Sequence, residues 1–146
     1  MLGIGNPIRS DDGVGVHVVE ALRKENSSDN VDLVEDISGI DTLGVITGYD
    51  RVIIVDAIKS GNDPGTICQF SLKDFVHKQT LHSFSPHGMD FLAMLEFGKS
   101  LFPGKIPEDI IIVAVEAGDI TTFSEKCTTE VEKAIKKVVD LIKGLL

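Results

Sequence analysis

The segment from Arg51 to Ala57 limits the possible folds of this chain more than any other stretch. Its Val-Ile-Ile-Val core is a β-branched run that is apolar on both faces, which is typical of a parallel strand covered by helices on each side. Other apolar runs of strand length alternate with stretches of helical periodicity. We therefore predict an α/β fold, a three-layer αβα sandwich around a mostly parallel twisted sheet of about five strands with one antiparallel strand. The length of 146 residues suits a single domain spanning residues 1–146.

The remaining elements are predicted from apolar periodicity and turn residues. Strands are expected at Met1–Ile4, Val31–Glu35, Thr66–Ser71 and Ile110–Val115, and helices at Gly13–Lys24, Leu43–Thr47, Met89–Lys99 and Val131–Leu145. The turn before Thr66 is too short for a parallel crossover, so the strand after it should form an antiparallel hairpin with its predecessor. The last helix begins with a capping-box sequence, Thr129-x-x-Glu132, although Thr128 could cap it instead.

The first strand leads into the most distinctive segment of the chain, Gly3-Ile4-Gly5-Asn6-Pro7-Ile8-Arg9-Ser10-Asp11-Asp12-Gly13-Val14-Gly15. Its Gly, Asn and Pro residues favour a tight turn, and the acidic pair Asp11 and Asp12 follows where a helix begins. In an open α/β sheet, ligands bind beyond the carboxyl ends of the strands. A carboxylate at this position can cap the helix, bind a metal ion or transfer a proton, and the residues alone leave these roles open.

Two further residues could complete a site at that edge of the sheet. Asp56 ends the strongest strand, although a plain strand terminus is the alternative, and His87 lies in a small-residue loop before a helix, where a solvated imidazole is the alternative. Neighbouring central strands would bring Asp12 close to Asp56. Carboxylate oxygens with one imidazole nitrogen suit zinc, nickel and similar divalent ions. The other histidines are expected to be structural: His17, His77 and His82.

Composition and missing motifs argue against several other classes. The net charge of −9 at pH 7 disfavours nucleic-acid binding, which needs a cationic surface. The apolar runs have strand length, so no membrane association is expected, and the lack of a charged leader before a long apolar segment favours the cytoplasm. Cys68 and Cys127 have no metal-ligand spacing and are expected to be buried, reduced thiols. Dinucleotide, phosphate-loop and nucleophile-elbow signatures are lacking, and Glu116 is interpreted as a solvated strand terminus or else a helper carboxylate.

These motifs, in this order, resemble those of the hydrogenase maturation proteases, endopeptidases that remove the C-terminal extension of the nickel–iron hydrogenase large subunit. The resemblance covers nearly the whole chain. Asp12 matches the first metal-ligand position of the family, Asp56 the second, and His87 of Ser85-Pro86-His87 the third. The resemblance implies that these three residues are both catalytic and metal-binding. Asp36 resembles a further acidic position of the family, to which we assign no role.

The resemblance also implies how the site would work. Nickel would arrive with the hydrogenase large-subunit precursor, so the protein is expected to hold no tightly bound cofactor of its own and to act as a monomer. Two alternatives remain open. The chain could be a non-catalytic binding module for a nickel-loaded partner on the same scaffold. It could also be an esterase similar to peptidyl-tRNA hydrolases, which share the Gly-x-Gly-Asn-Pro turn, although their catalytic His is missing from Arg9-Ser10-Asp11-Asp12.

Overall fold

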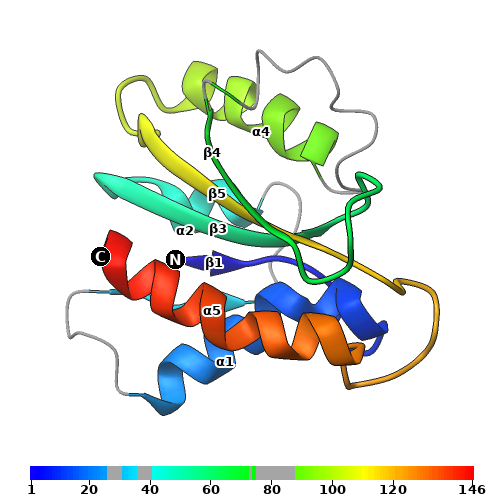
Figure 1. Ribbon diagram of the computed structural model, residues 1–146. Coiled ribbons are helices and arrows are strands. Elements are labelled where there is room, and N and C mark those ends of the chain that lie inside the picture. The colour runs from blue at the N-terminus through cyan, green and yellow to red at the C-terminus, as the bar shows by residue number, and fades with distance from the viewer. Residues whose placement is uncertain (26–30, 36–40, 73, 75–87) are drawn as a thin grey trace.

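The described strands form one mixed sheet with the order β2-β1-β3-β5-β4 (Figure 1). The computed structural model describes residues 1–25, 31–35, 41–72, 74 and 88–146. The strands are β1 (Leu2–Gly3), β2 (Val34–Glu35), β3 (Arg51–Ile58), β4 (Ile67–Ser71) and β5 (Asp109–Glu116). The helices are the 3₁₀ turn η1 (Ser10–Gly13), α1 (Val14–Lys24), α2 (Asp41–Ile46), α4 (Gly88–Leu101) and α5 (Thr129–Leu145). Only β4 runs antiparallel to its neighbour in this sheet, which confirms the predicted mostly parallel arrangement.

The two longest strands form the centre of the sheet. β3 and β5 pair in parallel along their whole length, from Arg51 opposite Asp109 to Ile58 opposite Glu116. Every β3 residue after Arg51 is buried, because helices cover both faces of the sheet at this point. The prediction drawn from the β-branched run is therefore confirmed.

β4 lies at an edge of the sheet and not beside β3. It pairs antiparallel with β5, with Cys68 opposite Ala114. The predicted direction is therefore confirmed, but the predicted hairpin with β3 is wrong. β5 occupies the place next to β3 because its own apolar residues need cover on both faces, whereas Gln69 and Ser71 of β4 are exposed, which an edge strand tolerates.

β1 is shorter than predicted but sits in a decisive place. It pairs with β2 on one side and with β3 on the other, where Leu2 lies opposite Ile54. The N–H of Ile4 continues the contact by donating to the carbonyl oxygen of Val55 at 2.9 Å. The chain therefore enters the turn that precedes η1 directly beside β3.

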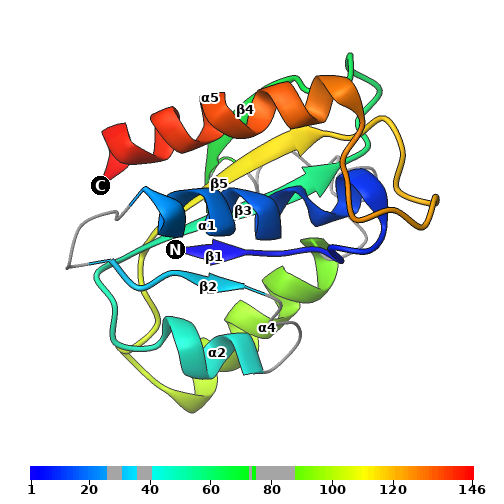
Figure 2. The ribbon, with the colours of Figure 1, turned by 90° about the horizontal axis from the view of Figure 1, so that it is seen from below.

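Two helical layers cover the sheet, as Figures 1 and 2 show. α1 and α5 pack on the face that carries Val55 and Val113, and α2 and α4 pack on the face that carries Ile54 and Ile110. Each buried aliphatic side chain of this kind contributes about 1.5–3 kcal/mol to stability. The predicted αβα layering is confirmed. None of the helices in the described residues combines the length and apolarity needed to cross a membrane.

Two glycines allow the first turn to lie tightly against the sheet. A Cβ on Gly15 of α1 would lie 2.4 Å from the carbonyl oxygens of both Ile4 and Val55. Gly5 has a φ of +127°, and a Cβ there would lie 1.8 Å from the carbonyl oxygen of Asp12. A larger residue at either position would therefore push η1 away from the ends of β1 and β3.

Candidate active site

Asp12 lies in η1, just beyond the carboxyl end of β1. The residue is buried, and its Oδ2 accepts a hydrogen bond from the backbone N–H of Asn6 at 3.2 Å. Asn6 is itself oriented by the N–H of Ile8, which donates to Asn6 Oδ1 at 3.1 Å. Within the described residues, the bond from Asn6 is the one hydrogen bond to the Asp12 carboxylate. The turn thus positions this carboxylate, and the described residues leave much of its capacity to accept hydrogen bonds unused.

Asp56 lies in β3, two residues before the strand ends at Ile58. It is buried, and its Oδ1 accepts a hydrogen bond from the N–H of Ala57 at 2.8 Å. Because side chains alternate along a strand, Asp56 shares a face with Ile54, the face covered by α2 and α4. β3 is the strand next to β1. This confirms the prediction that the strand before Asp12 and the strand that carries Asp56 are neighbours.

Asp11, next to Asp12 in sequence, has the opposite environment. Its Oδ1 accepts a hydrogen bond from the N–H of Thr128 at 2.6 Å, and its Oδ2 accepts one from the Thr128 hydroxyl at 2.9 Å. Oδ2 also accepts from the N–H groups of Gly118 at 2.7 Å and Asp119 at 2.9 Å. Asp11 therefore joins the first turn to the segment 117–128. Of the roles that the sequence left open for the acidic pair, the structure gives Asp11 a structural one.

The start of α5 depends on this contact and not on a capping box. The N-cap residue is Thr128, and its side chain makes no capping hydrogen bond because its hydroxyl donates to Asp11. Thr129 is already helical, so the predicted capping box of Thr129 and Glu132 is wrong. A carboxylate beside a helix N-terminus is also favoured by the helix dipole, so the distant Asp11 takes over the task of a local cap.

Glu116, the last residue of β5, is a further buried carboxylate at this edge. It is 2% exposed, so the expectation of a solvated strand terminus is wrong. Its Oε1 accepts from the N–H groups of Ser60 and Gly61, both at 2.9 Å, and its Oε2 accepts from the Ser60 hydroxyl at 2.5 Å. The turn after β3 folds over Glu116, and Glu116 in return holds the turn that follows the strand of Asp56. Ser60 and Gly61 are recognisable turn residues, but the sequence does not show that a residue 55 positions later binds them.

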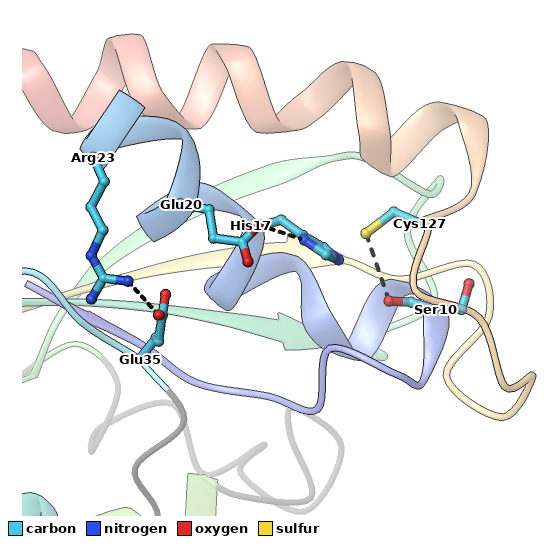
Figure 3. A network of polar contacts seen from close by, with 6 residues as sticks. All are labelled: Ser10, His17, Glu20, Arg23, Glu35 and Cys127. Carbon is cyan, nitrogen blue, oxygen red and sulfur yellow. Dashed lines mark hydrogen bonds and ion pairs between the residues drawn. The ribbon is translucent and has the colours of Figure 1, made fainter. Parts of the chain in front are cut away.

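The neighbourhood of the first turn also contains Cys127, shown in Figure 3 with Ser10. The Cys127 thiol donates to the carbonyl oxygen of Ser10, with a sulfur–oxygen distance of 3.7 Å. Burial, together with the charges of Asp11 and Glu132, raises the pKa of the thiol to about 12. Because the thiolate is the nucleophile, Cys127 is inert at neutral pH. Both cysteines are free, as predicted, but they are partly buried and not fully buried.

Figure 3 also shows the polar side chains along α1. The His17 Nδ1 lies 3.5 Å from the Glu20 Oε2, and Arg23 forms an ion pair with Glu35 of β2. The ion pair ties the end of α1 to β2. The Nδ1 of His17 therefore has a partner on its own helix, whereas its buried Nε2 has none among the described residues, and the structural role expected for it stays a prediction.

Several predicted residues lie outside the described part of the chain: His87, His77, His82 and Asp36. Within the described residues, no three His, Cys, Asp or Glu side chains form a group that could hold a metal ion. The expected triad needs His87, so the assignment of Asp12, Asp56 and His87 as ligands and catalytic residues stays a prediction.

The two predicted ligands in the described part of the chain are both carboxylates. Two buried carboxylates lie near the carboxyl ends of neighbouring parallel strands, Asp12 in the 3₁₀ turn after β1 and Asp56 close to the end of β3. Buried negative charges favour a cation beside them. Carboxylate oxygens, with an imidazole nitrogen supplied by a loop, suit a divalent transition metal.

Comparisons with known proteins give the chain its relatives. A family model described as hydrogenase maturation protease matches residues 16–144, a range that includes Asp56 and His87 and begins after Asp12. The hydrogenase 2 maturation protease of Escherichia coli strain K12 is 31% identical over 79% of this chain and 70% of its own length. The hydrogenase expression/formation protein HupD of Rhizobium leguminosarum bv. viciae is 31% identical over 96% of this chain and 69% of its own.

The fold agrees with these matches. The solved structure of the hydrogenase maturating endopeptidase HybD from E. coli superposes with a TM-score of 0.75 and 27% identity, covering 97% of this chain and 86% of that one. The chain therefore belongs to the hydrogenase maturation protease family.

Proposed function

We propose that this protein is an endopeptidase that removes the C-terminal extension of a nickel–iron hydrogenase large-subunit precursor after nickel has been inserted. Membership of a protease family supports the reaction class. The main support for the choice of Asp12 as a site residue is the difference in hydrogen bonding between Asp11 and Asp12. Asp11 is held by four hydrogen bonds, whereas Asp12 receives one within the described residues and keeps oxygen lone pairs for a ligand.

In this proposal the metal belongs to the substrate. Asp12, Asp56 and His87 together grip the nickel that the precursor already carries, so that a precursor without nickel is not recognised. The substrate-held metal then polarises the scissile carbonyl or lowers the pKa of an attacking water. No cysteine nucleophile is required, in agreement with the raised pKa of Cys127.

The same reasoning extends to the state of the protein in the cell. We expect a monomer in the cytoplasm whose protein partner is the large-subunit precursor. Because the metal comes with the substrate, the purified protein should retain much less than one nickel or zinc ion per chain. Elemental analysis after ordinary purification measures this content, and one retained ion per chain would point to a conventional metalloenzyme.

The decisive experiment is a processing assay. The protein is incubated with nickel-loaded precursor, and the precursor mass is followed by mass spectrometry, with metal-free precursor as the matched control. The expected result is loss of the C-terminal extension from the nickel-loaded form alone. If the protein binds the nickel-loaded precursor and the mass of the precursor stays unchanged, the chain is a binding module and the proposal is wrong.

A further inference from the structure

Two large apolar side chains are exposed to solvent near the segments that carry and anchor Asp11 and Asp12. Phe123 is 81% exposed and Ile8 is 49% exposed. Ile8 belongs to the turn before Asp12, and Phe123 belongs to the segment 117–128 that Asp11 anchors. We call these two side chains the apolar rim.

Backbone hydrogen bonds hold the two halves of the rim side by side. The N–H of Ser124 donates to the carbonyl oxygen of Ile8 at 3.0 Å, and the N–H of Ser10 donates to the carbonyl oxygen of Ser124 at 2.8 Å. These bonds form a parallel bridge between Arg9 and Ser124. Ile8 and Phe123 each come one residue before the two bridged positions, so the bridge brings their backbones together.

Side-chain hydrogen bonds hold the backbone of the residues before Phe123. The Asp119 Oδ1 accepts hydrogen bonds from the N–H groups of Thr121 at 2.8 Å and Thr122 at 3.1 Å. Asp11 binds the N–H of Asp119 itself. The exposure of Phe123 is therefore imposed by an ordered backbone. Because this backbone is already held in place, a partner that covers Phe123 has to immobilise only its side chain.

The rim lies within one turn of Asp12. The N–H of Ile8 donates to Asn6 Oδ1, and the N–H of Asn6 donates to Asp12 Oδ2. A polypeptide bound at the Asp12 carboxylate would therefore lie near Ile8. A protein that covers this edge would therefore bury the apolar rim at the same time.

We propose that the apolar rim is a docking surface for the hydrogenase large-subunit precursor and packs against an apolar segment of the precursor next to its cleavage site. The inference rests on the proposed function, which supplies a protein substrate at this edge. Aromatic residues are enriched at protein interfaces, and a few such anchors carry most of the binding energy. The rim thus provides affinity, while Asp12 and Asp56 provide recognition of the metal.

The test compares Phe123→Ala and Ile8→Ala with the wild-type protein. Steady-state processing of nickel-loaded precursor gives KM and kcat, and biolayer interferometry on immobilised precursor gives Kd. Phe123→Ala should raise KM and Kd about ten-fold, because burial of an aromatic side chain is lost, and should leave kcat within about two-fold. Phe123→Leu, which keeps an apolar side chain, should recover most of the affinity.

The matched control is Phe102→Ala. Phe102 is 40% exposed and lies near the opposite edge, where the N–H of Gly48, shortly before β3, binds the carbonyl oxygen of Lys105. This variant should bind and process as the wild type does. Melting temperatures of all variants check that each is folded.

The outcomes separate the two proposals. If the wild type shortens the precursor and Phe123→Ala and Ile8→Ala both match it in KM and Kd, the docking surface is wrong and the proposed function stands. If the wild type binds the precursor without shortening it and Phe123→Ala weakens the binding, the docking surface stands and the endopeptidase proposal is wrong. If the wild type neither binds nor shortens the precursor, both are wrong.

Discussion

Two neighbouring aspartates at the carboxyl edge of the sheet, Asp11 and Asp12, have the same side chain but different surroundings. We call the surroundings of Asp11 the anchored side of this edge and those of Asp12 the open side. Asp11 is fully buried, and hydrogen bonds from Thr128, Gly118 and Asp119 surround it. Asp12 is also buried but is held through one oxygen by the N–H of Asn6. Burial alone therefore does not distinguish a structural carboxylate from a candidate ligand. The difference lies in the hydrogen-bond donors among the described residues, which give four bonds to Asp11 and one to Asp12.

The largest effect is expected at the open side. Asp12→Asn, and Asp56→Asn on the neighbouring strand, each keep one side-chain oxygen that can accept a hydrogen bond but remove the negative charge that would bind the metal. Each should slow processing about 1000-fold or more, equivalent to about 4 kcal/mol. Steady-state processing of nickel-loaded precursor measures the loss.

Asp140→Asn, on the exposed side of α5, is the control for the loss of one charge and should process normally. Urea unfolding should show that Asp12→Asn and Asp56→Asn are folded. Near wild-type processing by both would remove the metal-grip mechanism and, with it, the distinction between the two sides.

A smaller effect, on stability and not on chemistry, is expected at the anchored side. Asp11→Asn turns one acceptor oxygen into an NH₂ donor that faces the N–H groups of the 117–128 segment. The free energy of unfolding should fall by about 3 kcal/mol, because hydrogen bonds to a buried charged group are lost. Urea titration followed by circular dichroism measures the fall.

In the folded fraction, Asp11→Asn should still process the precursor to within a few-fold of the wild type. The opposite pattern, unchanged stability with processing abolished, would show that Asp11 takes part in the chemistry and is not the structural carboxylate. The comparison of the two neighbouring residues would then be reversed.

Glu116 tests whether the anchored pattern extends along the edge. Glu116→Gln keeps one acceptor oxygen but cannot serve both the N–H groups of Ser60 and Gly61 and the Ser60 hydroxyl as the carboxylate does. We expect a loss of about 1–2 kcal/mol in the free energy of unfolding. Differential scanning calorimetry can compare it with Glu108→Gln at an exposed position, which should be neutral.

The smallest effect is expected for Cys127→Ser. The Ser hydroxyl can still donate to the carbonyl oxygen of Ser10, and the thiol, whose pKa of about 12 keeps it protonated, supplies no nucleophile. Processing should stay within about two-fold of the wild type. Iodoacetamide labelling at pH 8, followed by mass spectrometry, should modify Cys127 far more slowly in the native than in the urea-unfolded protein. Rapid native labelling would contradict the protected thiol.

Local sequence determined the sheet and its helical layers. The β-branched run of β3 and the apolar run of β5 can be buried on both faces only at the centre of a covered sheet, and the apolar stripe of α5 requires one of its faces to be buried. These features depend on residues that are close together in the chain. They were accordingly predicted with boundaries close to those observed.

Tertiary structure decided what the individual polar residues do. The donors that hold Asp11 come from 107 to 117 positions later in the chain, and the turn that buries Glu116 comes from 55 to 56 positions earlier. No local pattern reports such partners, because a carboxylate has the same propensities whether or not a distant segment folds over it. Strand pairing is likewise not fixed by local sequence: β4 pairs with β5 and not with its sequence neighbour β3. The sequence by itself predicted that Asp11 and Asp12 lie at the carboxyl edge of the sheet. Only the folded chain showed that Asp11 is held by hydrogen bonds from a distant segment.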